Sequence, residues 1–156
     1  MVADWDLRFM RLAIHIGGWS KDRSTKVGCV IVGTANEVRS IGYNGFPTNI
    51  DDDVPERHER PAKYSWTEHA ERNAIYNAAR IGVSLAGSRM YLPWFPCMDC
   101  SRGIVQSGVT ELIAFAPNTA DSRWGKDFEL SLVLLKEGGV TVRFMESCEA
   151  LSDVAE

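Results

Sequence analysis

The second half of the chain alternates between helix-like and strand-like segments, and this alternation limits the fold more than any other feature. Helical apolar spacing with glycine ends occurs in residues 67–82, 97–108 and 127–139. Short segments typical of strands are residues 88–94, 109–116 and 140–145. Because strands that alternate with helices form sheets covered by helices, the pattern predicts a layered α/β domain.

The first half of the chain adds a helix and two strands. Apolar residues from Trp5 to Ile16 recur at helical spacing and stop at a Gly-Gly pair. Residues 26–33 and 37–45 predict two strands joined by a turn. The complete order predicts a three-layer α/β/α fold with a five-stranded mixed sheet. Residues 46–66 contain prolines and three consecutive aspartates without a sustained period, so we expect a long loop, and such loops are often functional.

The length and composition bound the class of protein. With 156 residues and 45% hydrophobic residues, the chain fits one domain over residues 1–156, with a mobile tail at about 146–156. The charged N-terminus resembles no signal peptide and no apolar run could span a membrane, so we expect a cytoplasmic protein without a membrane partner. A formal net charge of −4 lacks the basic footprint of a protein that binds long nucleic acid, although a small charged substrate is compatible with it.

The cysteines and histidines indicate a metal site. In a reducing cytosol a close cysteine pair favours metal binding or catalysis over a disulfide. Cys97 and Cys100 lie in the first turn of a predicted helix, where the helix dipole favours thiolates. His69 opens the preceding predicted helix at the same edge of the sheet. These residues would supply three zinc ligands and leave the fourth position to water. Cys29 and Cys148 have no neighbouring cysteine or histidine in the sequence, and we expect both to be small buried residues.

Glu71 decides between the kinds of metal site. It follows His69 by two residues and would reach the metal-bound water without ligating zinc. In zinc deaminases the metal lowers the pKa of this water, the hydroxide attacks a ring carbon, and such a glutamate moves the protons. A closed structural zinc site that recruits Cys29 or Cys148 is an alternative, but it gives Glu71 no role. A redox dithiol is another, but it does not explain His69.

Several longer blocks carry a more specific resemblance. The segments "DRSTKVGCVIVG", "GYNGFP", "HAERNAIYNAARIG" and "FPCMDCSRGIVQSGV", within residues 22–115, are similar to the deoxycytidylate (dCMP) deaminase family. The resemblance implies the cytidine-deaminase fold, one Zn²⁺ per subunit, and conversion of dCMP and water to dUMP and ammonia, with attack at C4. It also implies a homo-oligomer, a hexamer or smaller, and in parts of the family control by dCTP and dTTP.

The same resemblance implies roles for individual residues. His69, Cys97 and Cys100 would bind zinc and Glu71 would shuttle protons. The backbone of Ala70 would hold the base carbonyl, and the backbone around Phe95 and Pro96 would contact the amino group. Asn44 would contact a sugar hydroxyl, or it would be an asparagine that only stabilises the turn in which it lies. In the charged segment 20–28, Ser24 and Lys26 would bind the phosphate, unless this is only a solvated turn. Arg80 would be an interface, phosphate or surface residue, and His58 an exposed loop histidine.

Two departures from the family pattern leave the substrate open. Pro93 and Trp94 precede "FPC", and residues 118–131, which include Trp124, do not match the usual aromatic segment. Both tryptophans would either shape the base or sugar pocket or pack in the core or an interface. The alternatives are therefore a deaminase of another aminated base, either a modified cytosine or a base within nucleic acid, and a non-catalytic, zinc-stabilised interaction subunit.

Overall fold

A five-stranded mixed sheet forms the centre of the molecule. The computed structural model describes residues 4–151, apart from the side chain of Glu149. Its strands, in the order β2-β1-β3-β4-β5, are β1 (Gly28–Val32), β2 (Val38–Tyr43), β3 (Arg89–Leu92), β4 (Glu111–Phe115) and β5 (Thr141–Met145). β1 is antiparallel to β2 and β3, whereas β3, β4 and β5 are parallel. The predicted sheet is confirmed.

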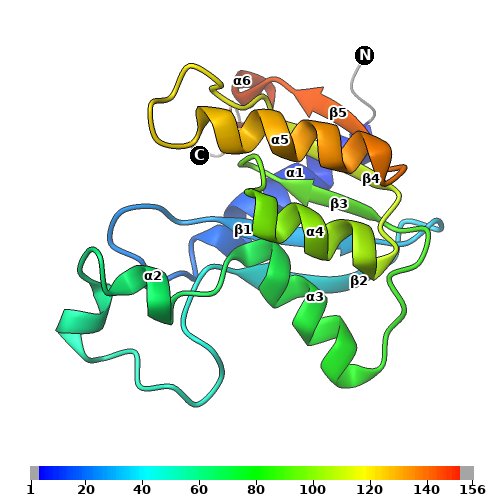
Figure 1. Cartoon of the computed structure of the whole chain (residues 1–156). Helices are drawn as coiled ribbons and strands as arrows, with labels where there is room; N and C mark the ends of the chain where they lie inside the picture. The colour runs from blue at the N-terminus through cyan, green and yellow to red at the C-terminus, as the bar shows by residue number, and fades with distance from the viewer. Residues whose placement is uncertain (1–3, 152–156) are drawn as a thin grey trace.

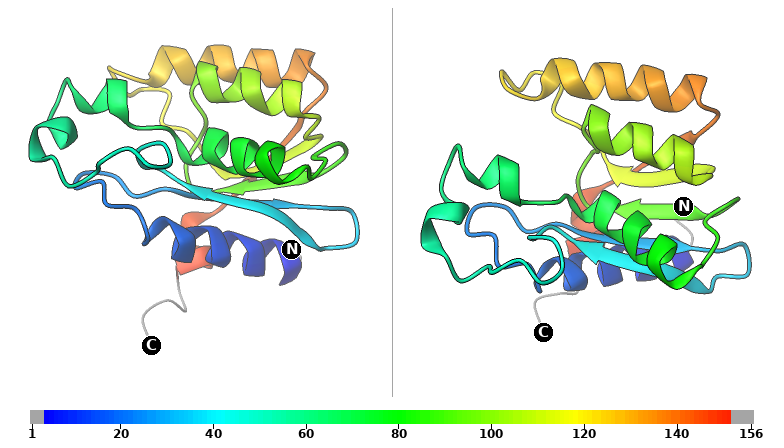
Figure 2. Two further views of the ribbon diagram at one scale, coloured as in Figure 1. Left: turned by 90° about the horizontal axis from the view of Figure 1, so that it is seen from below. Right: turned by 60° about the horizontal axis from the view of Figure 1, so that its bottom comes forward.

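Helices cover both faces of this sheet (Figures 1 and 2). One face carries α1 (Asp4–Gly17) and α6 (Ser147–Leu151), and the other carries α3 (Ala70–Ile81), α4 (Met98–Ser107) and α5 (Gly125–Glu137). The predicted three-layer α/β/α fold is therefore confirmed. Within residues 4–151, every helix is too short or too polar to span a membrane.

The core forms on both sides of the sheet because successive strand residues point to opposite faces. In β1, Cys29 and Ile31 pack in the cluster under α3 and α4, while Val30 and Val32 pack in the cluster under α1. All five residues of β1 are buried. This strand accordingly reads as a continuous apolar run, as expected of a strand covered on both faces.

The chain end differs in part from its prediction. We expected a mobile tail over about 146–156, but residues 147–151 form α6 and Ala150 is fully buried with Phe9 and Met145. This small side chain lets the short helix lie against α1, a contact that local sequence does not reveal. Residues 152–156 lie outside the described part of the chain.

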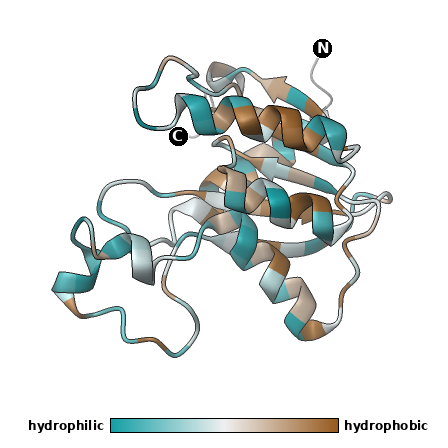
Figure 3. Ribbon diagram, viewed as in Figure 1, coloured by the Kyte–Doolittle hydropathy of each residue, from teal (hydrophilic) through white to brown (hydrophobic). Residues whose placement is uncertain are grey.

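The long loop between β2 and α3 extends from the sheet and is largely hydrophilic (Figures 1 and 3). It contains only a 3-10 turn, η1 (Pro55–His58), and α2 (Lys63–Trp66). Reciprocal backbone hydrogen bonds of 3.0 and 2.8 Å between Gly45 and Glu68 close the loop at its base. The start of α3 is thereby fixed beside the end of β2.

β2 and β3 run in the same direction, because each is antiparallel to β1. The segments that leave these two strands therefore start at the same edge of the sheet. One leads to the first turn of α3 and the other to the first turn of α4. The two motifs singled out in the sequence consequently meet there.

Candidate functional site

The first turns of two helices bring three metal-binding side chains together. His69 is the N-cap of α3, Cys97 is the N-cap of α4, and Cys100 lies one turn further. His69 Nδ1 is 3.5 Å from Cys97 Sγ and 3.4 Å from Cys100 Sγ. All three ligand atoms lie within 4.8 Å of one another. The predicted ligand set is therefore assembled, and two thiolates with one imidazole fit zinc.

The three ligand side chains shift one another's pKa values. A hydrogen bond from Cys100, followed by one with His69, lowers the pKa of the Cys97 thiol to about 4. The same bond with Cys97, together with burial, raises the pKa of Cys100. The bond with Cys97 raises the pKa of His69 against the effect of burial. Because thiol and imidazole ligands must be deprotonated, binding of a metal at this cluster would release protons.

A closed four-ligand site is not formed by the described residues. The metal-binding group contains neither Cys29 nor Cys148. Cys29 is buried in β1 as expected. Cys148, which we also expected to be buried, is exposed on α6, in the helical layer on the opposite face of the sheet. The three-ligand arrangement is that of a catalytic zinc site, which keeps one position open.

Glu71 lies in the first turn of α3 with 4% of its surface exposed. Burial raises the pKa of its carboxyl group, and the positive charge of His69 offsets only part of this effect. Glu71 lines the same pocket as His69 and Cys97. A buried carboxyl group with a raised pKa, beside a metal cluster, is suited to accept and return protons.

Aromatic side chains form one wall of this pocket. Trp94, Phe95, Trp124 and Phe128 all line it. The rings of Phe95 and Phe128 meet edge to face with centroids 5.8 Å apart, and Trp124 stacks on Phe128 at 6.5 Å. Trp94 remains 49% exposed. Flat aromatic walls beside a few polar groups are typical of a site for a planar ring. Both tryptophans left open by the sequence thus belong to the pocket.

Of the four residues predicted to contact the base or sugar, three line this pocket. Ala70 and Phe95 line it, whereas Pro96 is buried and is not among the lining residues. Asn44 lines it, but its Oδ1 accepts the Val27 N–H at 2.8 Å and its Nδ2 donates to the Thr25 carbonyl at 2.8 Å. Its amide thus holds the turn that precedes β1, and a contact with the sugar stays a prediction.

The predicted phosphate residues Ser24 and Lys26 do not line the pocket. Both backbone N–H groups of Ser24 and Thr25 donate to Asp22 Oδ1, at 2.8 and 3.0 Å, and Ser24 Oγ also binds this oxygen at 3.0 Å. A carboxylate therefore occupies the donors that a phosphate would need. The geometry does not support the predicted role of this turn.

The structure adds pocket residues that the sequence did not reveal. They come from the long loop, from the turn before β1 and from the segment after β4, and they are Asp22, Thr25, Val27, Arg60, Lys63, Tyr64, Thr67, Arg123 and Phe128. Residues 46–66 show no helical or strand spacing of apolar residues, and this predicted a long loop of the kind that is often functional. The sequence of the loop did not indicate which of its side chains would line the pocket.

His58 and Arg80, two other residues discussed from the sequence, contact the long loop. His58 lies within this loop, and Arg80 connects it to α3. His58 stacks on Phe46 with ring centroids 4.7 Å apart and contacts the Asp52 carbonyl through Nε2 at 2.6 Å. It is half-buried rather than exposed as predicted. Arg80 donates to Thr48 Oγ1 at 2.8 Å. Both side chains therefore support the loop from outside the pocket.

Comparison with known proteins assigns the chain to a family. Residues 3–116 match the family model of the cytidine and deoxycytidylate deaminase zinc-binding region. The chain belongs to the cytidine and deoxycytidylate deaminases. Zinc is accordingly the metal for this site, and His69, Cys97 and Cys100 are the described residues that fit it.

Relatives of this deaminase match along most of its length. The chain is 37% identical to a deoxycytidylate deaminase of Mus musculus, with 90% of this chain and 79% of the relative covered. It is 36% identical to an uncharacterized deaminase of the luxG 3′ region of Aliivibrio fischeri, with 93% and 96% covered. Among solved structures, the dCMP deaminase of cyanophage S-TIM5 in complex with dCMP and dUMP has a TM-score of 0.75 and 25% identity, with 93% and 99% covered.

Proposed function

We propose that this chain catalyses hydrolytic deamination of dCMP to dUMP and ammonia. The observation that carries the proposal is the buried Glu71 in the same pocket as the cluster of His69, Cys97 and Cys100. The chain belongs to a deaminase family, and relatives along most of its length are named deoxycytidylate deaminases. A related solved enzyme contains dCMP and dUMP.

In this mechanism the three ligand residues would hold zinc, which supplies Lewis-acid activation of water. Glu71 accepts a proton as water adds to C4 of the cytosine ring, and it delivers a proton to N3. Glu71 then takes the proton of the new C4 hydroxyl and passes it to the amino group, so that the C4–N bond breaks, ammonia departs and a C4 carbonyl remains. The raised pKa of Glu71 favours this two-way exchange, because a strong acid would not return the proton.

The pocket walls orient the ring. Trp94, Phe95, Trp124 and Phe128 offer flat apolar surfaces against which a planar base can stack. Ala70 and Phe95 line the pocket, which supports the contacts proposed for their backbone with the base carbonyl and the amino group. The contacts themselves, including that of Pro96, remain part of the proposal.

A substrate panel tests this function. The zinc-loaded chain is incubated with free pyrimidines, nucleosides, monophosphates and triphosphates of cytosine and adenine, and ammonia release is measured. We expect dCMP to have the highest kcat/KM, and chelation of zinc to abolish turnover. An inert dCMP, with turnover of another base, would refute dCMP as the substrate but leave the deaminase chemistry intact.

One observation supports a second candidate, deamination of a modified cytosine. The Trp94 ring is half exposed in the pocket wall, at a position where the sequence departs from the family pattern. A ring that is free to move could accommodate a substituent on the base. A higher kcat/KM for 5-methyl-dCMP than for dCMP in the same panel would favour this candidate.

The remaining alternatives find less support in the molecule. A net charge of −4 disfavours a base within long nucleic acid. A non-catalytic zinc subunit gives no reason to bury the Glu71 carboxyl group, which costs free energy.

We further propose a single catalytic domain in the cytoplasm, where a reducing environment keeps both thiol ligands available. Assembly into a homo-oligomer, a hexamer or smaller, and control by dCTP or dTTP stay predictions.

A further inference from the structure

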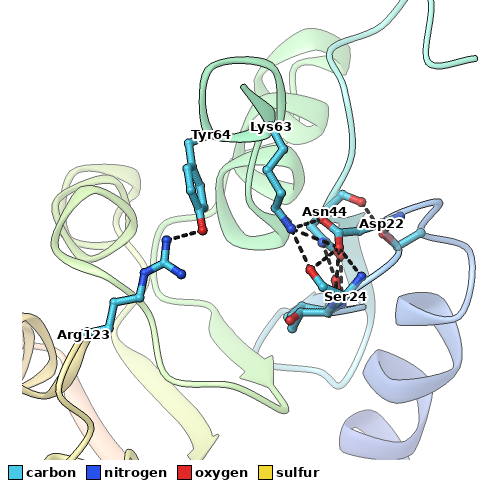
Figure 4. A network of polar contacts seen from close by, with 9 residues as sticks. Asp22, Ser24, Asn44, Lys63, Tyr64 and Arg123 are labelled. Atoms are coloured by element: carbon cyan, nitrogen blue, oxygen red, sulfur yellow. Dashed lines mark hydrogen bonds and ion pairs between the residues drawn. The ribbon is translucent and has the colours of Figure 1, made fainter. Parts of the chain in front are cut away.

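Three cationic side chains line the pocket outside the metal cluster. Arg60 and Lys63 come from the long loop, and Arg123 comes from the segment between β4 and α5. Figure 4 shows Lys63 and Arg123 on opposite sides of Tyr64. Positive charge thus reaches the pocket from two segments that are far apart in the sequence.

The charge of Lys63 is already compensated. Its Nζ lies 3.1 and 2.8 Å from the two carboxylate oxygens of Asp22 and 2.8 Å from Ser24 Oγ (Figure 4). The side chains of this pair are only 11% and 9% exposed. Lys63 therefore anchors the loop to the turn before β1, and its donors are not free for a ligand.

Arg60 and Arg123 have no such compensation. In the part of the chain that the structure describes, neither forms an ion pair with a carboxylate. Asp121, close to Arg123 in sequence, accepts the backbone N–H groups of Arg123 and Trp124 at Oδ1. The two guanidinium groups therefore bring positive charge to the pocket that no carboxylate pairs with in the described residues.

Tyr64 holds Arg123 in place. The guanidinium lies 4.8 Å from the Tyr64 ring centroid and 5.2 Å from that of Trp124, and it donates a hydrogen bond to Tyr64 Oη (Figure 4). Burial raises the pKa of Tyr64, but the bond from Arg123 and the charges of Arg123, Arg60 and Lys63 lower it overall. Aromatic faces thus orient Arg123, and four further N–H donors of its guanidinium remain for an anion.

We propose that Arg60 and Arg123 bind the 5′-phosphate of the substrate and give this chain its preference for a nucleotide over a nucleoside. Guanidinium groups match phosphate oxygens in geometry and charge. The inference rests on the proposed function, because it takes the base to lie against Glu71 and the aromatic wall. It replaces the role predicted for Ser24 and Lys26, whose turn is filled by a carboxylate.

The test compares dCMP with deoxycytidine, which differs only by the phosphate. The ratio of the two kcat/KM values is measured for Arg60→Ala, Arg123→Ala and Arg123→Lys. We expect each alanine variant to lower this ratio by about 10- to 100-fold, the effect of one charge-assisted hydrogen bond, and Arg123→Lys to lower it less. Lys126→Ala, which removes an exposed charge near Arg123 without touching the pocket, should leave the ratio unchanged.

Binding measured by calorimetry separates this inference from the proposed function. If the wild-type chain does not deaminate dCMP but binds it more tightly than deoxycytidine, and Arg123→Ala removes this difference, the function fails and the inference holds. If dCMP is deaminated but both arginine variants keep the wild-type ratio, the inference fails and the function holds. A ratio that falls in Lys26→Ala instead, or equal affinity of the wild-type chain for both compounds, also overturns the inference.

Discussion

The fold buries the carboxyl group of Glu71, and this burial costs free energy. Glu71 is 4% exposed, burial raises its pKa, and it lies on the first turn of α3 beside His69. A buried carboxyl group is destabilising unless its protonation or its interactions compensate. Its place in the pocket that the metal ligands and the aromatic wall also line therefore indicates a role in proton transfer rather than in stability.

The ligand assignment predicts a selective effect of cysteine variants. Cys100→Ala removes one of three ligand atoms, so the zinc affinity should fall by more than about 100-fold. Cys148→Ala is the matched control, because this exposed cysteine lies on α6 outside the metal-binding group. Bound zinc is measured by mass spectrometry of the metal after dialysis. Retention of zinc in Cys100→Ala, with its loss in Cys29→Ala, would indicate a site that uses Cys29.

At the scale of elements, the close approach of α3 to β2 positions His69 and Glu71. A Cβ atom at Gly42 would lie 2.4 Å from both the Ala70 carbonyl oxygen and the Ala74 backbone nitrogen. Ala70 and Ala74 are themselves fully buried against the sheet. Small residues on both elements thus bring the first turn of α3 to the edge of the sheet.

Gly42→Ala should therefore push α3 away from β2. We expect the free energy of unfolding to fall by about 1–3 kcal/mol, the usual cost of overpacking, and zinc affinity to fall with it. Urea denaturation and metal titration check both effects. Gly103→Ala in α4 is the control, since its Cβ would meet only side-chain atoms at ordinary contact distance, Ile75 at 3.5 Å and Arg72 at 3.9 Å, and alanine favours a helix. Equal stability of the two variants would contradict this account of the α3–β2 contact.

The link between the long loop and the turn before β1 predicts a dependence on pH. Burial raises the pKa of Asp22, but the hydrogen bonds from Lys63 and from the backbone of Thr25 and Ser24 outweigh it and hold this pKa well below its ordinary value. The stabilisation is complete above the unfolded-state pKa of about 4, declines as the pH falls below it, and is gone below the folded-state value.

Asp22→Asn should accordingly lower the free energy of unfolding by roughly 2–4 kcal/mol at pH 7, because it leaves the buried Lys63 ammonium group without its charged partner. The difference from the wild-type chain should shrink as the pH falls from 5 towards 2. Denaturation curves at a series of pH values measure it. Asp52→Asn, which removes the exposed partner of Lys21, should leave these curves nearly unchanged. A pH-independent difference for Asp22→Asn would contradict the assignment.

The elements and the ligands could be predicted from the sequence because their signals are local. Helical spacing and the glycine ends at Gly82 and Gly108 mark α3 and α4. His69, Cys97 and Cys100 stand in short motifs at the starts of these helices. By contrast, α2 and α6 have only 4 and 5 residues, too few for a period, and they depend on tertiary contacts.

The polar side of the pocket could not be predicted in this way. Lys63 and Asp22 are 41 residues apart in sequence, and Arg123 and Tyr64 are 59 apart. Nothing in either local sequence specifies such a partner. Ser24 and Lys26 were chosen because hydroxyls and a cation share one turn, but Asp22 in the same turn occupies its N–H donors. Asp22 was therefore the feature of the local sequence that argued against a phosphate at Ser24 and Lys26.

At the scale of the whole molecule, several separate segments contribute to the site. The starts of α3 and α4 hold the metal-binding group, the segments from β3 to α4 and from β4 into α5 supply the aromatic wall, and the long loop and the segment from β4 to α5 supply the cationic side chains (Figure 1). The site thus draws on segments from Asp22 to Phe128. The central claim is that this assembly uses Glu71 to deaminate dCMP with zinc in place.

The most direct test of this claim is to measure ammonia release from dCMP by the zinc-loaded wild-type chain and by Glu71→Gln. Bound zinc and the circular dichroism spectrum are recorded for both proteins. We predict that the wild-type chain turns dCMP over and that Glu71→Gln lowers kcat by at least about 100-fold with zinc content and fold retained. Equal turnover by both proteins, or no ammonia from the zinc-loaded wild-type chain, would contradict the claim.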